Sequence, residues 1–117
     1  MSVELRTMAE KACPACAGDV PVLKGDELTP LHGVLGDKWD LVEEHHLVRT
    51  FEFKNFVDAL AFTNVIGEVA EDLNHHPEIM TTWGKVVTTI WTHKVDGLTE
   101  SDFIFAARVE QAYTDAL

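Results

Sequence analysis

Two adjacent histidines in the second half of the chain are well suited to acid/base chemistry. They are His75 and His76, in the stretch EDLNHHPEIMTTW that runs from Glu71 to Trp83, and a third histidine, His93, follows a run of β-branched residues. Imidazole titrates near pH 6.5, so a histidine can donate or accept a proton at neutral pH. A reaction that removes water needs an acid for the departing hydroxyl and a base for a second proton. Two imidazoles on opposite sides of a flat substrate can supply both.

Each of these histidines also has a plainer interpretation. A His-His pair directly before Pro77 is often only the polar end of a helix, because proline pushes the preceding residue out of the helical region. His93 could simply lie on the surface at a strand end. A metal site would need Glu71 and the three histidines to converge at about 2 Å from one ion, and their spacing does not resemble the helical HExxH arrangement. The remaining histidines are expected only at the surface: His32, His45 and His46.

Length and charge narrow the function classes. The 117 residues suit a single domain, and a hydrophobic content of 46% allows a real core. The formal net charge of −11 argues against nucleic-acid binding and against binding to an anionic membrane surface. No apolar run approaches the roughly 20 residues that span a bilayer, and the N-terminus lacks a signal-type apolar segment. A cytoplasmic protein is therefore expected.

The only cysteines, Cys13 and Cys16, form the motif CPAC near the N-terminus. A structural zinc ion wants four ligands, and a redox CxxC normally opens a helix after a strand. Neither context is present, so two free thiols are expected, although a metal shared between subunits stays open. Residues 1–25 contain proline and glycine and lack sustained periodicity. They are predicted to be an N-terminal extension, with residues 26–117 forming the domain.

The first half of that domain is predicted to hold a helix and a hairpin. Apolar residues at helical spacing over residues 28–35 are followed by Gly36, a typical stop signal. Residues 39–44 and 45–53 alternate as strands do, and they are close enough in sequence to turn near residues 44–46.

The second half is predicted to repeat strand pairing between two helices. Asn55 is a plausible N-cap for a long helix over residues 55–73, which must end before Pro77. If that helix continued, Glu71 and His75 would lie one turn apart on one face. Residues 78–83 and 85–94 follow as two strands. Thr99 and Asp102 form a capping sequence for a last helix.

The order of elements is thus α-β-β-α-β-β-α. Two hairpins separated by helices predict an α+β fold, in which a four-stranded antiparallel sheet carries helices on one face.

The stretch from Glu71 to Asp102 resembles the pterin-4a-carbinolamine dehydratases. That family's pattern has an acidic or similar residue, then three residues, His-His-Pro, an aromatic residue, then a histidine or tryptophan, and then an aspartate. The matching residues are Glu71, His75, His76, Pro77, Trp83, His93 and Asp102. The segment upstream, with Trp39 in DKWDLVEE, is similar as well. The resemblance covers roughly residues 26–115, and CPAC lies outside the core pattern.

The resemblance implies a hydro-lyase that removes water from 4a-hydroxytetrahydropterin to give the quinonoid dihydropterin. Such an enzyme recycles the cofactor of aromatic amino-acid hydroxylases, which suggests a functional link to a hydroxylase. His75 and His93 would be the acid/base pair, with His76 binding or orienting the pterin. The implied substrate-binding residues are Glu71, Asn74, Pro77, Trp39, Thr92 and Asp102, with Trp39 as a pocket wall. The resemblance also implies no metal, no cofactor, and a homodimer or homotetramer.

Two other functions remain open on the same fold. Animal members of the family also act as dimerisation cofactors of a transcription factor, so this chain could be a regulatory partner protein. It could also act on a pterin related to molybdopterin. The presence of all three histidines favours the enzyme, because a scaffold has no need of them.

Overall fold

The computed structural model describes residues 3–10 and 21–116, which contain four α-helices and one four-stranded sheet. The helices are α1 (Val3–Ala9), α2 (Leu28–Leu35), α3 (Phe56–Leu73) and α4 (Glu100–Ala116). The strands are β1 (Asp40–Val42), β2 (His46–Glu52), β3 (Glu78–Thr82) and β4 (Lys85–Ile90). The 3-10 turn η2 (Gly25–Glu27) precedes α2, and η3 (His93–Val95) follows β4. CPAC lies outside the described residues.

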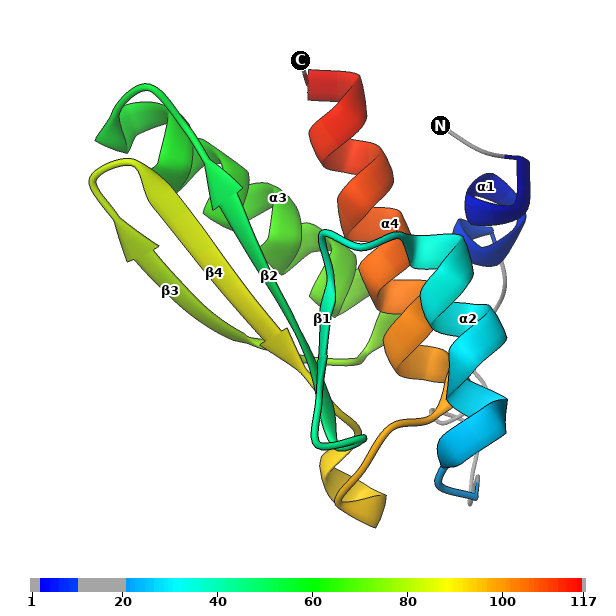
Figure 1. Cartoon of the computed structure of the whole chain (residues 1–117). Coiled ribbons are helices and arrows are strands. Elements are labelled where there is room, and N and C mark those ends of the chain that lie inside the picture. Colours follow the sequence, from blue (N-terminus) through cyan, green and yellow to red (C-terminus); the bar gives the residue numbers. More distant parts are fainter. Residues whose placement is uncertain (1–2, 11–20, 117) are drawn as a thin grey trace.

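All pairings in the sheet are antiparallel, and the strand order is β1-β2-β4-β3. Helices α3 and α4 lie along one face of this sheet (Figure 1). Side chains alternate along each strand, so one set faces the helices. In β2 these are Leu47, Arg49 and Phe51, and all three are buried. The predicted α+β class and the antiparallel sheet backed by helices on one face are confirmed.

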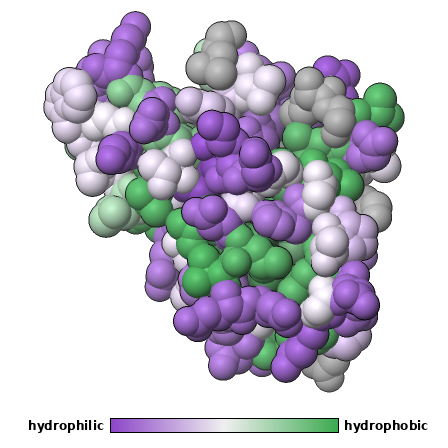
Figure 2. Space-filling view, viewed as in Figure 1, coloured by the Kyte–Doolittle hydropathy of each residue, from purple (hydrophilic) through white to green (hydrophobic). Residues whose placement is uncertain are grey.

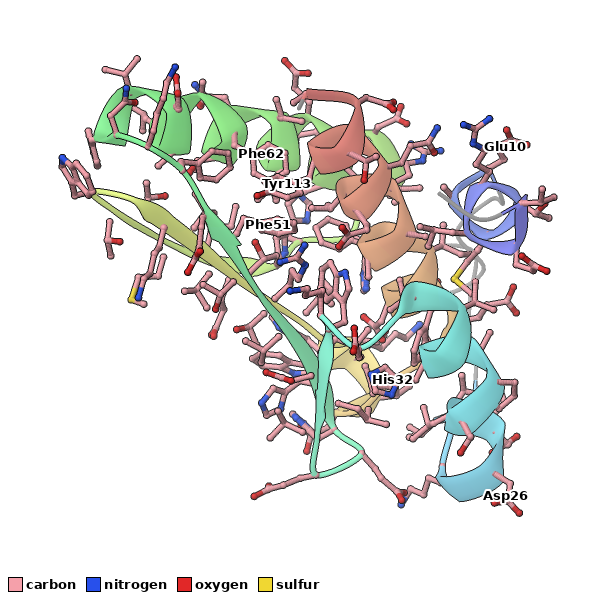
Figure 3. All side chains as sticks on the ribbon, turned by 45° about the horizontal axis from the view of Figure 1, so that its top comes forward. Glu10, Asp26, His32, Phe51, Phe62 and Tyr113 are labelled. Carbon is pink, nitrogen blue, oxygen red and sulfur yellow. The ribbon has the colours of Figure 1, made fainter. Side chains whose placement is uncertain are left out.

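The core lies between the sheet and helices α3 and α4. On α3, the side chains of Ala59, Phe62 and Ile66 are buried. Phe62 meets Phe51 of β2 and Tyr113 of α4, with ring centroids 4.9 and 5.5 Å away, and the three rings lie together (Figure 3). Burial of such rings stabilises the domain by roughly 1.5–3 kcal/mol per side chain. This cluster fixes α3 against the sheet.

Helix α1 is an element that the sequence did not suggest. Seven residues are too few to show helical periodicity, yet Leu5, Met8 and Ala9 are buried and the helix lies against α4 (Figure 1). Arg108 on α4 donates from Nε to the carbonyl oxygen of Ala9 at 3.1 Å, which satisfies a carbonyl at the end of α1. The first residues therefore add a layer outside α4.

One face of the molecule is largely polar (Figure 2). Figure 2 shows hydrophilic residues over much of one face, with a hydrophobic area in its lower half. Within the described ranges, none of the helices has both the length and the apolar content to cross a bilayer.

Candidate active site

The end of helix α3 sets the directions of the two adjacent histidines. Asn55 caps the start of this helix, and its side chain accepts a hydrogen bond from the Asp58 amide at 2.8 Å. At the other end Asn74 adopts a left-handed conformation with φ of 52°, which asparagine tolerates better than most residues. The chain turns there, so His75 points inward and is 9% exposed, whereas His76 is exposed.

Because the helix ends at Leu73, Glu71 and His75 do not form the one-turn pair considered from the sequence. Glu71 instead interacts with His76, whose Nε2 lies 2.6 Å from Oε2 of the carboxylate. Both side chains are more than half exposed. This contact therefore orients His76 but contributes little to the free energy of unfolding.

His75 is held by a buried carboxylate. Its Nε2 lies 2.6 Å from Oδ1 of Asp102, which is fully buried. The other oxygen, Oδ2, accepts hydrogen bonds from Thr92 Oγ1 and from the amide of Thr99, both at 2.8 Å. A carboxylate only accepts, so His75 Nε2 carries a proton, and in the neutral ring Nδ1 is left as the accepting atom. The arrangement prepares His75 to take up a proton.

His93 does not lie on the strand where the sequence placed it. Strand β4 ends at Ile90, and the amide of Thr92 donates to the carbonyl oxygen of Gly97 at 2.9 Å. This bridge closes a tight loop, and His93 begins the 3-10 turn η3 within it. The His93 side chain is exposed, and its ring centroid lies 4.4 Å from that of Trp91.

These segments meet at an open pocket of about 360 Å³. The pocket is lined by Asn74, His75, His76, Trp91, Thr92, His93 and Lys94. The structure therefore brings together the three histidines, Asn74 and Thr92 from the predicted set. Glu71 and Asp102 lie behind this lining, each bonded to one of its histidines. Pro77 is not part of the lining.

Trp39 is not brought to this pocket, contrary to the expectation that it forms a wall. Its side chain is fully buried in the core, and its ring lies edge-on to Phe51 with centroids 6.1 Å apart. Nε1 donates to Oε1 of Glu110 at 2.8 Å. Trp83 is not part of the pocket lining either. It is 70% exposed in the turn between β3 and β4.

Sequence reasoning missed Trp91 and Lys94 as lining residues. A signal for Trp91 was present, since strand alternation puts it on the same side as His93. Lys94 reaches the pocket only because the strand gives way to η3. His32 is not part of the pocket lining, and its Nε2 donates to the carbonyl oxygen of Trp39 at 2.6 Å. Across the part of the chain that is described, three or more histidine, cysteine, aspartate or glutamate side chains do not gather as a metal-holding group.

Known proteins resemble this chain in sequence and in fold. The family model for pterin 4 alpha carbinolamine dehydratase matches residues 21–112. A Rubrobacter xylanophilus protein that carries the family name is 55% identical over 104 residues, which cover 89% of this chain and 96% of that protein. An Alkaliphilus metalliredigens protein with the same name is 46% identical over 111 residues, covering 95% of this chain and all of the other.

Solved structures share the fold. A Brucella melitensis chain described as a transcriptional coactivator/pterin dehydratase is 30% identical, with a TM-score of 0.71 over 78% of this chain and 97% of the other. A pterin dehydratase-like RuBisCO assembly factor of the alpha-carboxysome is 22% identical, with a TM-score of 0.56 over 68% of this chain and 93% of the other, and it supports the fold alone. The chain therefore belongs to the pterin-4-alpha-carbinolamine dehydratase family, and it is a hydro-lyase of that family.

Proposed function

We propose that this chain removes water from 4a-hydroxytetrahydropterin by acid/base catalysis with His75 and His93. The observation that carries the proposal is the convergence of three histidines from two segments on one pocket, with one of them bound to a buried carboxylate. A flat bicyclic pterin fits an open, polar pocket of about 360 Å³ that has one aromatic wall, Trp91.

The division of labour follows from the hydrogen bonds. In neutral His75 the proton sits on Nε2 beside Asp102, so Nδ1 accepts the proton of the pterin nitrogen next to the carbinol carbon. The electron pair freed from that N–H bond forms a carbon–nitrogen double bond and breaks the carbon–hydroxyl bond. His93, in its protonated form, gives the departing hydroxyl a proton, and water leaves. Asp102 stabilises the imidazolium that forms on His75, as a buried carboxylate does in other histidine-based sites.

His76 has a different part in this scheme. Its ring is exposed and bonded to Glu71, whose carboxylate only accepts. His76 and Asn74 therefore bind and orient the edge of the pterin, and Glu71 keeps His76 in place. Thr92 acts indirectly: its hydroxyl donates a hydrogen bond to Asp102 and so helps to hold the carboxylate that binds His75.

The test is a dehydration assay on synthetic 4a-hydroxytetrahydropterin with the wild type, His75→Ala and His93→Ala. Loss of either acid/base group should lower the rate by roughly 10²–10⁴-fold while the fold is kept. His32→Ala serves as a matched control, because His32 lies outside the pocket. Wild-type rates in both site variants would reject the assignment.

The substrate's origin and the assembly state belong to the same proposal. The pterin would come from an aromatic amino-acid hydroxylase, and the chain would act in the cytoplasm as a homodimer or homotetramer. Helix α3 offers exposed apolar side chains that suit an interface, with Phe56, Val57 and Leu60 exposed by 45%, 73% and 46%. Light scattering on the purified protein measures the assembly state directly, and a monomer at micromolar concentration would reject it.

A further inference from the structure

A hydrogen bond next to the pocket joins two separate segments of the chain. His45 stands in the turn between β1 and β2, and Asp96 directly follows η3. Nε2 of His45 lies 2.8 Å from Oδ1 of Asp96. Because a carboxylate only accepts, the proton of this hydrogen bond belongs to His45. The pair therefore ties the first hairpin to the loop that carries His93.

The aromatic side chains beside this hydrogen bond form a continuous row. Nδ1 of His45 lies 3.0 Å from Nδ1 of His46, and their ring centroids lie 5.4 and 6.0 Å from that of Trp91. Trp91 in turn lies against His93. His45 and His46, which the sequence placed only at the surface, are half-buried in this row. The Trp91 ring thus lies against two histidines from the start of β2, the strand next to β4, and from the turn before it.

The loop around His93 depends on such outside support. Turn η3 has only three residues, and its hydrogen bond from the Asp96 amide to the carbonyl oxygen of His93 is 3.2 Å long. Asp96 itself is left-handed, with φ of 53°. On the inner side Thr92 is anchored to Asp102. Within the described residues, the contact that the His93 ring makes is with Trp91, and its backbone lies in the η3 turn.

We infer that His45 is a positioning residue for His93. It fixes the η3 turn through Asp96 and helps to hold the Trp91 ring on which His93 lies. His45 does not line the pocket, so it acts through these two neighbours and not on the pterin. The inference rests on the proposed function, in which His93 exchanges a proton with the substrate. A reacting group displaced by about 1 Å can lose about 10²-fold in rate, so loosening this support has a measurable cost.

The first test separates kcat from KM. His45→Ala should lower kcat about 5- to 30-fold and change KM by less than about twofold, since the binding residues stay in place. His45→Gln offers an amide N–H near the position of Nε2 and should recover most of the loss. Lys54→Gln, which removes an exposed ion pair with Asp58 far from the pocket, is the control and should match the wild type.

Asp96→Asn provides a second route to the same interaction. Asparagine suits the left-handed conformation and loses only the charge, so this variant should fold even if His45→Ala does not. It should lower kcat in the same direction as His45→Ala, by a smaller factor. Unchanged kcat in both Asp96→Asn and the folded His45 variants would overturn the inference.

A second measurement does not depend on activity. In the wild type the ring current of Trp91 should shift the NMR signal of the His93 ring proton Hε1 away from that of an unstructured histidine. In His45→Ala this signal should move back and broaden. A fall in kcat with an unmoved His93 signal would assign the loss to another cause and overturn the inference. A moved signal in a protein whose wild type dehydrates nothing would support the placement of His93 and reject the proposed function alone.

Discussion

Asp102 and His75 are joined by a hydrogen bond of 2.6 Å that is buried beneath the pocket. The two oxygens of this carboxylate have different partners. Oδ1 receives the imidazole, and Oδ2 receives Thr92 and the amide of Thr99. The backbone amide of Thr99 can only donate a hydrogen bond. If asparagine replaced Asp102, its single side-chain oxygen would therefore have to take the position of Oδ2.

Asp102→Asn should therefore invert the His75 ring's tautomer. The asparagine oxygen must stay opposite Thr92 and Thr99, which leaves its NH₂ facing His75 Nε2. Nε2 then has to accept, the proton moves to Nδ1, and the ring can no longer take a proton from the substrate. We expect kcat to fall about 10²–10⁴-fold. Ring ¹⁵N NMR measures the tautomer directly, and a retained Nε2–H signal with wild-type kcat would contradict the assignment of His75 as base.

Trp39→Phe should reduce stability and leave catalysis intact. The variant loses the hydrogen bond from Nε1 to Glu110, a partly buried acceptor that also binds Arg49 at 2.9 Å. Hydrogen bonds to charged groups contribute about 1.5–3 kcal/mol, so the free energy of unfolding should fall by about that much. Urea denaturation measures it.

Trp83→Phe is the matched control for that change. Trp83 is 70% exposed, so its replacement should alter the free energy of unfolding by less than about 0.5 kcal/mol. If Trp39→Phe instead raised KM and left the free energy of unfolding unchanged, the result would support Trp39 as a pocket wall, as the sequence suggested.

Leu5→Ala should show that α1 belongs to the folded domain. Leu5 is only 5% exposed against the core, and truncation of a buried leucine costs about 2–5 kcal/mol. Val3→Ala on the same helix, where the side chain is 77% exposed, should cost less than about 0.5 kcal/mol. Equal unfolding free energies for the two variants would show that α1 does not pack on α4 in solution.

Local signals predicted most of the fold. Asn55 begins α3 as a cap, the pair Thr99 and Asp102 begins α4, and Pro77 limits the extent of α3. These signals depend on neighbouring residues, so the sequence carries them directly. Helix α1 gives no such signal, because its burial depends on α4, about a hundred residues away in the chain.

The site was predicted less completely for a related reason. Strand alternation around Thr92 could be followed to Lys94 in the sequence, but the bridge from Thr92 to Gly97 ends the strand and redirects His93. Likewise, the left-handed Asn74 moves Glu71 away from His75 and toward His76. The supporting position of His45 follows from Asp96 and Trp91, which lie some 50 residues further along the chain.

The carboxylate of Asp102 also caps helix α4 through the amide of Thr99. Helix ends open far more often than whole domains unfold. An opening of this first turn would release His75 and Thr92 at the same moment. The rate of hydrogen exchange at the Thr99 amide therefore measures how often this turn opens. On heating, activity should decline at a lower temperature than the one at which the sheet unfolds.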